Sequence, residues 1–491
     1  MENKQNFAPQ RTAAELRQLL SDESGNARYV IANLFDEGTF VELGAYVKRA
    51  VTEYDNPFST GTADCEFEGV ITGYGAVDGH LVYAFVQDFS RMKGALSEAH
   101  AKKIVSLYNT ALNNNAPVIG VFDSAGAFIL EGVSALSGYG AIMQKAAYAS
   151  GVIPQIALIS GLCTGSSAII ADMFDFKIGV NGKGELYVNP SFILKEKYKD
   201  NNIGSIKAAG ENGLVDVTAD TIDKALDSVK ELLTYLPADY ETGTNIDAAN
   251  DNINRLTPEI ETLISTGGYD MKQVVMAIAD EGKIYETARD NACEAFTGFV
   301  RINGMVVGVC ANQPMVSEGT ISAKAALKFK QFITFCDNFK IPLLTLVDTT
   351  GFDISIESEN TPYSYALAEL AAIYAISSNA KVTVILGKAY GAAFTLLGSK
   401  QLGADIVYAV DKSEISIMPP ESAVQFAWND EITSSDDPAA KKEELLNKWK
   451  NTMASPLTAA RNGDIDDIIS YEETRQRITA AFEMLAFKNG G

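Results

Sequence analysis

The chain has 491 residues, of which 47% are hydrophobic and 21% charged, an ordinary composition for a folded globular protein. Its 40 Lys and Arg residues against 63 Asp and Glu residues give a formal net charge of −23 at pH 7. This charge argues against nucleic acid or an anionic membrane surface as the main partner, because both repel an acidic protein. The composition is typical of an acidic cytoplasmic protein.

The cysteines are scattered along the chain and include no CxxC pair: Cys65, Cys163, Cys293, Cys310 and Cys336. Such a pattern indicates neither a zinc site nor a disulfide framework, and it favours a reducing compartment. We therefore expect no metal in this chain. The first residues lack the apolar core of a signal peptide.

The N-terminal part of the chain predicts a helix at residues 12–20, a turn into a strand at 34–43 and a polar loop at 56–64. Residues 69–86 predict a β-hairpin that turns at residues 78–79, because the dipeptide Asp-Gly suits the tight turns between antiparallel strands.

A helix is expected after this hairpin, with Ser97 as its N-cap. Its apolar face has helical spacing: Ile104, Leu107, Tyr108 and Ala111. Pro117 then opens an apolar run without alternation, which is typical of a strand buried on both faces. Asp123, small residues and Gly126 follow and predict a sharp turn.

A second apolar run at residues 156–159 leads into the small-residue segment GLCTGSSAII, which starts at Gly161. Residues 151–171 carry no charge over about the length of a membrane span. Pro154, Gln155 and the glycines within them favour a buried strand and helix over a membrane span.

These features return 225 residues later. Three pairs show the offset: Pro117 and Pro342, Asp123 and Asp348, and Gly126 and Gly351. The second hairpin is expected at residues 298–311, and the run 382–386 leads into GKAYGAAFTLL from Gly387. One offset that holds over roughly 50 residues predicts two copies of one domain.

We place the two domains at residues 1–240 and 241–491, with a polar linker at 237–266. A second polar insertion at 429–450 predicts one helix with a mostly solvated face, and residues 472–485 predict the last helix.

A strand, a glycine turn and a helix start leave backbone N–H groups without partners. Two such turns side by side can hold one oxyanion. The alternative to an oxyanion-binding role is that the small residues only let helices pack closely against strands. Ser124, Ser166 and Ser167 have no evident His partner, which argues against a serine hydrolase, and His80 and His100 are predicted to be surface or structural residues.

Several segments together resemble the biotin-dependent acyl-CoA carboxyltransferases, over about residues 34–485. The segments are QDF at 87–89, LSEAHAKKI at 96–104, APVIG at 116–120, ASGVIPQI at 149–156, RINGMVVGVCANQP at 301–314, FCDNFKIPLLTLVD at 335–348, KVTVILGKAYGAAF at 381–394 and DDII at 466–469. Taken together the motifs are specific.

The resemblance implies an α/β fold of two tandem crotonase-like (ClpP/crotonase) β-β-α spiral domains. It assigns acyl-CoA to the first domain and biotin, on a separate carrier protein, to the second. It also implies a homo-oligomer, a hexamer built as a trimer of dimers, whose active site lies between the N-domain of one subunit and the C-domain of another. No GxxxxGK[ST] and no AMKM occurs, so biotin carboxylase or membrane decarboxylase subunits and the carrier are expected on other chains.

The same resemblance implies two backbone oxyanion holes and no protein nucleophile. The thioester hole falls on Gly165 and Ser166, and the biotin hole on Ala392 and Ala393, with Gly391 allowing close approach. The remaining predicted binding residues are Gly126, Ala127, Gly351, Phe352 and Lys388. For Lys388, a solvated side chain is an equally acceptable interpretation.

The chain departs from the family at four places. The family reads SGGARIQEG where this chain has SAGAFILEG, so Phe128 replaces an arginine, and Ser166 replaces a glycine. Residues 359–367 replace a GGIIRHGA stretch, and MPPESAV at 418–424 replaces an MG-A-x-GA segment.

Three functional hypotheses follow. The first is a carboxyltransferase subunit that carboxylates a short acyl-CoA such as acetyl- or propionyl-CoA. The second is the α subunit of a sodium-pumping decarboxylase, which runs the same half-reaction backwards on methylmalonyl-, malonyl- or glutaconyl-CoA. The third is a non-catalytic paralogue that acts as an assembly scaffold, against which the retained Gly165 and Gly391 argue.

Overall fold

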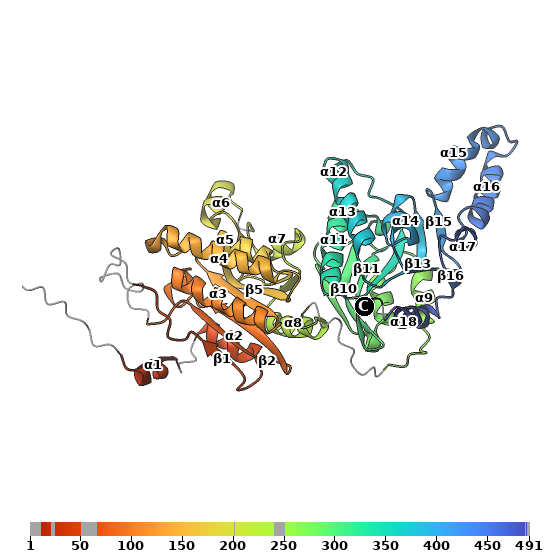
Figure 1. Ribbon diagram of the computed structural model, residues 1–491. Helices are drawn as coiled ribbons and strands as arrows, with labels where there is room; N and C mark the ends of the chain where they lie inside the picture. The colour runs from red at the N-terminus through yellow and green to blue at the C-terminus, as the bar shows by residue number, and fades with distance from the viewer. Residues whose placement is uncertain are drawn as a thin grey trace, which may run out of the picture. The chain divides into compact units, whose positions relative to one another are not determined.

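The computed structural model describes residues 11–20, 25–50, 66–200, 202–239, 251–486 and 488. The chain divides into two compact units, the first formed by Met1–Ala209 with Thr218–Lys230 and the second by Gly210–Val217 with Glu231–Gly491 (Figure 1). The predicted loop at 56–64, Cys65 and the expected boundary between residues 240 and 241 lie outside the described residues.

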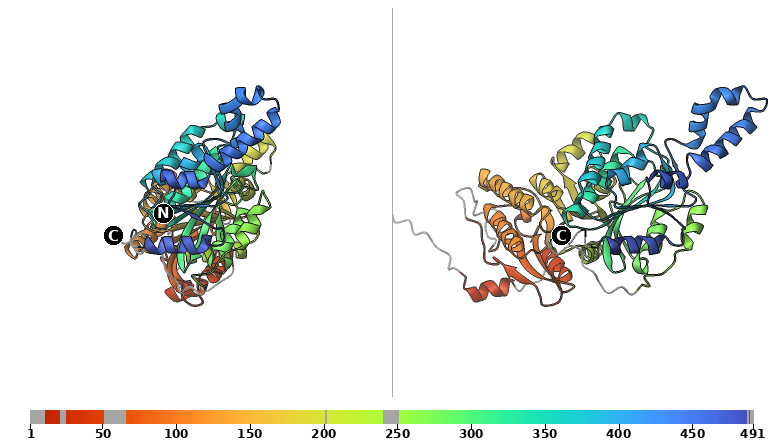
Figure 2. Two further views of the ribbon diagram at one scale, coloured as in Figure 1. Left: turned by 90° about the vertical axis from the view of Figure 1, so that its right-hand side faces the viewer. Right: turned by 45° about the vertical axis from the view of Figure 1, so that its right-hand side comes forward.

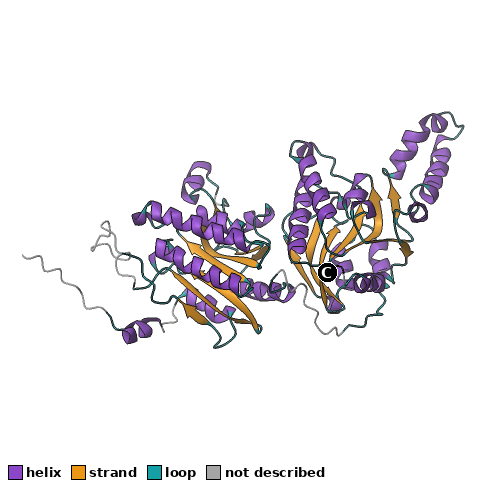
Figure 3. Ribbon diagram, viewed as in Figure 1, coloured by secondary structure: helices purple, strands orange, loops and turns teal. Residues whose placement is uncertain are grey.

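The first unit is built on a sheet with the strand order β1-β2-β3-β4-β5-β6-β8, in which β7 also pairs with β5. Figure 3 shows the strands in orange and the helices in purple. Its strands are β1 (Val41–Leu43), β2 (Val70–Val77), β3 (His80–Gln87), β4 (Val118–Ser124), β5 (Gln155–Thr164), β6 (Phe176–Val180), β7 (Glu185–Tyr187) and β8 (Val217–Ala219). The helices up to this point are α1 (Ala13–Leu20), α2 (Asn26–Leu34), α3 (Glu98–Asn113), α4 (Val133–Ala149), α5 (Ser166–Asp172), α6 (Ser191–Tyr198), α7 (Ile206–Glu211) and α8 (Ile222–Tyr235). β2 and β3 are antiparallel, whereas β3 to β6 run parallel, because helices connect them.

The second unit repeats this plan with the order β16-β14-β13-β12-β11-β10-β9, and β15 also pairs with β13. Its strands are β9 (Ile284–Thr287), β10 (Ala295–Ile302), β11 (Met305–Asn312), β12 (Leu343–Thr349), β13 (Lys381–Tyr390), β14 (Ile406–Val410), β15 (Glu414–Ser416) and β16 (Asp467–Ile469). Its helices are α9 (Glu259–Ser265), α10 (Met271–Ile278), α11 (Ala323–Asn338), α12 (Ile356–Glu359), α13 (Tyr363–Ile376), α14 (Ala392–Leu396), α15 (Pro420–Thr433), α16 (Pro438–Thr452), α17 (Pro456–Asn462) and α18 (Thr474–Met484).

Both hairpins form where the sequence predicts them. They turn at residues 78–79 and 303–304, all four of which have positive φ. An aspartate from the preceding segment holds each turn: Asp36 accepts both turn N–H groups at 3.1 and 2.9 Å, and Asp280 accepts its pair at 3.0 and 2.7 Å. The two predicted copies therefore share not only their hairpins but also the hydrogen bonds that hold the hairpin turns.

The helices α3 and α11 bury the predicted apolar faces, and Ser97 caps α3 by accepting the N–H of His100 at 2.9 Å. A buried lysine of each helix binds the first hairpin strand of its own unit. Lys103 Nζ donates to the carbonyl of Val70 at 2.5 Å, and Lys328 Nζ donates to the carbonyl of Ala295 at 2.7 Å. Burial lowers the pKa of both lysines to about 8.

This burial predicts a pH dependence of stability. A lysine whose pKa is about 8 when folded and about 10.4 when unfolded binds fewer protons in the folded state between these values, so its contribution to the free energy of unfolding rises with pH in that window. We expect Lys328→Met to reduce this rise by about 1–3 kcal/mol relative to the wild type, measured by urea unfolding from about pH 7.5 to 10. The exposed Lys324→Met on the same helix is the control. An unchanged slope in Lys328→Met would contradict the assignment.

Two predictions about polar segments are wrong. The expected linker at 237–266 is packed from residue 251 onward, since Thr257 and Ile260 are fully buried in the second unit. The insertion at 429–450 is not one helix, because α15 and α16 form a pair that projects from the second unit (Figure 2). Trp428 and Trp449 meet between them with ring centroids 5.7 Å apart. The contact between the two helices uses few apolar residues. The mostly polar sequence of the segment therefore gave no indication that it forms a packed helix pair.

The uncharged stretch at 151–171 forms β5 and most of α5, as predicted. Among the described residues, we find no helix with the length and apolar character needed to cross a bilayer.

Candidate active site

The predicted glycine turns lie beside each other in both units. A Cβ atom placed on Gly126 would lie 3.6 Å from Thr164 Oγ1, and one placed on Gly351 would lie 3.8 Å from the carbonyl oxygen of Tyr390. Thr164 and Tyr390 are the last residues of β5 and β13, directly before the glycines that open α5 and α14. Each unit thus brings together the ends of two neighbouring parallel strands, where loops can face a substrate.

Gly165 and Gly391 connect these strands to their helices with φ of 58° and 63° and ψ of −125° and −150°, a conformation that favours glycine. Their own N–H groups donate to the carbonyls of Tyr187 and Ser416, at 3.0 and 2.9 Å. The prediction that Gly165 offers its N–H to a thioester is therefore corrected. The accepting carbonyls belong to the short strands β7 and β15, which pair with the ends of β5 and β13.

The next residues do present free donors. Ser166 and Ala392 are the first residues of α5 and α14, so their N–H groups have no carbonyl one turn earlier to bind. Within the described part of the chain, neither N–H has a hydrogen-bond acceptor. The strand registers make Ser166 the equivalent of Ala392. Ala392 is exposed, whereas Ala393 is fully buried, so Ala392 is the more accessible of the two residues predicted for the second hole.

The facing turn offers one more donor. The carbonyl of Gly126 accepts the N–H of Leu96 at 2.8 Å, and the N–H of Phe128 donates back to Leu96 at 2.9 Å. Because alternate residues of an extended segment point to opposite sides, the N–H of Ala127 between them points away from Leu96. The N–H of Gly126 itself is bound by the hydroxyl of Ser124 at 3.1 Å.

The second unit repeats each of these contacts. The carbonyl of Gly351 accepts the N–H of Ile321 at 3.1 Å, and the N–H of Asp353 donates to Ile321 at 3.0 Å, which leaves the N–H of Phe352 pointing away. The hydroxyl of Thr349 binds the N–H of Gly351 at 3.1 Å. The predicted residues Ala127 and Phe352 are therefore placed as backbone donors beside the α5 and α14 helix starts of their own units.

Asp123 and Asp348 hold the strand ends in register. Asp123 Oδ1 accepts the N–H of Leu162 at 3.2 Å, and Asp348 Oδ1 accepts the N–H of Lys388 at 2.8 Å. Burial raises the pKa of both carboxyl groups. The Lys388 side chain is exposed, with Nζ 3.8 Å from a carboxylate oxygen of Glu318, a position that suits a solvated lysine.

Two residues that the sequence did not single out support the turns. The guanidinium of Arg49, which is 8% exposed, lies over the ring of Phe128 at 4.4 Å from the ring centroid to Cζ. Tyr363, from the segment that departs from the family at 359–367, accepts the N–H of Asp353 at 2.9 Å and donates to the carbonyl of Ile321. The only sequence signal for these contacts was that Phe128 and the segment 359–367 depart from the family pattern.

Neither histidine is placed as a catalytic base. His100 is fully buried, and burial lowers the pKa of its imidazole to about 3, so it stays neutral. His80 is exposed on the first hairpin. Ser167 contacts the hydroxyl of Tyr139 at 3.2 Å rather than an imidazole. Among the described residues, neither histidine is therefore paired with Ser167 as in a serine hydrolase.

Comparison with known proteins identifies this doubled arrangement of sheet, turn and helix start as that of a carboxyltransferase. The chain belongs to the carboxyl transferase domain family, which matches residues 24–490. It is 36% identical over 470 residues to the carboxyltransferase subunit of propionyl-CoA carboxylase from Haloferax mediterranei, covering 94% of this chain and 90% of the relative. It is 37% identical over 470 residues, with the same coverage, to the alpha subunit of methylmalonyl-CoA decarboxylase from Propionigenium modestum.

Among solved structures, transcarboxylase 12S, determined with methylmalonyl-CoA and methylmalonic acid bound, matches with a TM-score of 0.90 and 31% identity over 98% of this chain and 97% of that chain. The predicted family and the predicted fold class of two crotonase-like domains are confirmed, and the chain is an enzyme of the carboxyltransferase type.

Proposed function

We propose that this chain moves a carboxyl group between carrier-bound biotin and a short-chain acyl-CoA. The observation that carries the proposal is the pair of equivalent sets of backbone N–H donors, Ser166 with Ala127 in the first unit and Ala392 with Phe352 in the second. A transfer between two carbonyl compounds develops negative charge on two oxygens, and fixed backbone donors stabilise such charge without reorganising.

In the first unit, Ser166 and Ala127 would bind the thioester oxygen while the carbon next to the carbonyl loses or gains its substituent. The glycine before Ser166 lets the thioester approach the backbone closely, as only glycine favours the conformation there. The buried His100 is a poor candidate for a base in this unit, because burial lowers its pKa to about 3 and its ring contacts Gln87.

In the second unit, Ala392 and Phe352 would bind the ureido oxygen of biotin. Biotin, when bound, supplies the ring nitrogen that carries the carboxyl group. The residues present fit a compact, uncharged ring: the methyl of Ala392 leaves room, and Ile417, which is 74% exposed next to the turn, offers an apolar wall. We propose that the biotin is carried by a separate protein.

Large apolar side chains stand exposed beside each turn: Ile129, Val133, Ile354 and Ile356 are between 74% and 99% exposed. Exposed apolar patches of this kind mark contacts with other proteins. The transcarboxylase 12S relative is described as a hexamer. We propose that copies of this chain assemble so that these residues are covered, as a hexamer that works in the cytoplasm, alone or attached to a membrane through a partner subunit.

The experiment is to incubate the purified protein with free biotin and either methylmalonyl-CoA or malonyl-CoA, and to follow loss of the carboxyl group by chromatography. Biotin-dependent loss is expected from at least one thioester. No loss from either, in a preparation that is folded and oligomeric, would leave the scaffold hypothesis. Both directions use the same half-reaction, so carboxylase and decarboxylase partners must be distinguished by reconstitution with the respective subunits.

A further inference from the structure

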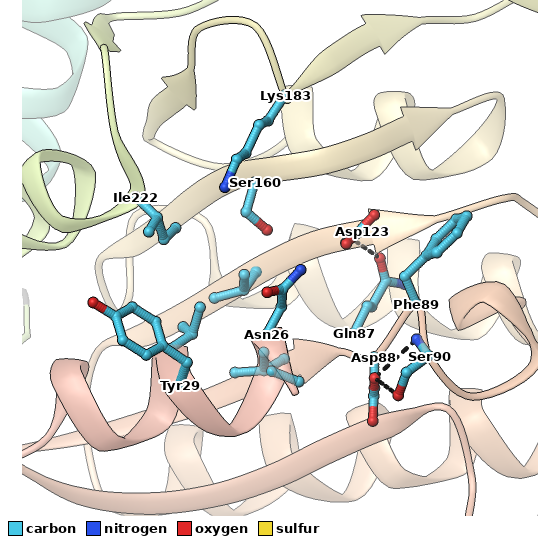
Figure 4. Close-up of a pocket in the computed structure, with 14 residues that line it drawn as sticks. Asn26, Tyr29, Gln87, Asp88, Phe89, Ser90, Asp123, Ser160, Lys183 and Ile222 are labelled. Carbon is cyan, nitrogen blue, oxygen red and sulfur yellow. Dashed lines mark hydrogen bonds between the residues drawn. The ribbon is translucent and has the colours of Figure 1, made fainter. Parts of the chain in front are cut away.

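The first unit contains a pocket of 260 Å³ whose lining includes neither Gly126 nor Gly165 (Figure 4). Its polar lining includes Asn26, Gln87, Asp123, Ser160 and Lys183. Ser124 lies on the side of β4 that faces Tyr139 of α4, so Asp123, the preceding strand residue, points to the opposite face of the sheet. α2 covers the pocket on that face, through Asn26, Ala27 and Val30.

The internal repeat shows what occupies the equivalent place in the second unit. α2 and α10 both lead into the aspartate that binds the hairpin turn, Asp36 in one unit and Asp280 in the other. Counting back eleven positions from each aspartate reaches Gly25 and Tyr269. The buried positions of the two helices agree with this alignment: Ala27, Val30, Ile31 and Leu34 match Met271, Val274, Val275 and Ile278.

In the second unit this place is filled by aromatic rings. Tyr269, 6% exposed, donates its hydroxyl to Asp348 Oδ2 at 3.0 Å. Tyr471 donates to the carbonyl of Leu386 at 3.0 Å. The strand registers make Leu386 the equivalent of Ser160, so the second unit also has a larger side chain on the floor of this place.

In the first unit the equivalent carboxylate, that of Asp123, has no tyrosine hydroxyl bound to it among the described residues. Asp123 Oδ1 accepts the N–H of Leu162, as Asp348 Oδ1 accepts that of Lys388. Among the described residues no group donates to Asp123 Oδ2, and this carboxylate lines the pocket. The first unit has Gly25, which carries no side chain, where the second has Tyr269, and the small Ser160, which lines the pocket, where the second has Leu386. A cavity of about 150 Å³ already admits a benzene ring in other proteins, so 260 Å³ accommodates a phenol-sized ring.

We propose that this pocket binds a small aromatic ligand whose ring carries an O–H or N–H donor, with that donor directed at Asp123. The ligand takes the part that the side chain of Tyr269 plays in the second unit. Val86 and Val121 supply apolar contact for the ring, and Ser160 leaves space on the floor.

The test uses the full-length protein and 4-methylphenol, which is the tyrosine side chain without its backbone. Saturable binding is expected in ligand-observed NMR and titration calorimetry. Toluene, the same ring without the donor, is expected to bind about ten- to a hundredfold more weakly, because a hydrogen bond to a charged acceptor is lost. Absence of saturable binding, or equal binding of toluene, would overturn the proposal.

Ser160→Leu, which copies the second unit, should abolish binding of 4-methylphenol while leaving the melting temperature close to that of the wild type. Asp123→Asn replaces the charged acceptor with a neutral amide and should reduce the preference over toluene. If Ser160→Leu does not fold, an unchanged preference in Asp123→Asn would overturn the proposal. Tyr269→Ala is the positive control: 4-methylphenol should raise its melting temperature by refilling the second unit. Wild-type affinity in a folded Ser160→Leu protein would overturn the proposal.

Discussion

Ser166→Pro is expected to lower turnover of the acyl-CoA by about 10²–10³-fold, because it deletes one backbone donor from the proposed thioester hole. Ser166 opens α5, and proline is well tolerated at the first position of a helix, where its missing N–H has no helical partner. The preceding Gly165 already has a non-helical conformation, so the added ring meets no helical residue before it. The chemistry should therefore fail while the fold persists.

The matched control is Ser166→Ala, which removes the hydroxyl but keeps the N–H. Near-normal turnover is expected from this variant. The measurement is kcat for loss of the carboxyl group from malonyl-CoA, together with the melting temperature. If folded Ser166→Pro turned over as fast as the wild type, the thioester hole would have to lie elsewhere.

Ala392→Pro is expected to produce a similar loss, about 10²–10³-fold, on the biotin side. Ala392 opens α14 as Ser166 opens α5, and Gly391 precedes it with the same kind of conformation. The informative measurement is the ratio of biotin-dependent to biotin-independent decarboxylation of malonyl-CoA. Ala392→Pro should lower this ratio, whereas Ser166→Pro should lower both rates together.

Ala392→Ser supplies the control for the second unit, since it introduces the side chain that the first unit carries at the equivalent place and retains the N–H. We expect its ratio to stay near that of the wild type. A ratio in Ala392→Pro equal to that in Ala392→Ser would mean that the second helix start does not touch biotin.

The two copies have kept the same backbone and changed their side chains. Asp123 and Asp348, Ser124 and Thr349, and Lys103 and Lys328 make the same bonds in both units. Gly161 and Gly387 must remain glycines, because a Cβ atom at either place would overlap the neighbouring aspartate. The differing residues include Ser166 against Ala392, at the proposed donor sites, and Gly25 against Tyr269, beside the proposed pocket. This pattern fits one scaffold that serves two different substrates.

The sequence by itself determined the repeat, both hairpins, the buried strands and the positions of the glycine turns. These features depend on local rules: the period of apolar residues, the Asp-Gly and Asn-Gly turns, and the proline that opens each buried strand. The sequence also identified the family, because the family's motifs are spread along nearly the whole chain.

Only the tertiary structure decided which backbone donors are free. The N–H groups of Gly165 and Gly391 donate to carbonyls of β7 and β15. These strands come about twenty residues later, and no local sequence pattern predicts their pairing with β5 and β13. The aromatic filling of the second unit was equally hidden, because Tyr269 and Asp348 are 79 residues apart. Hydrogen bonds are short and directional, so whether a donor is spent or available depends on what the folded chain places within about 3 Å of it.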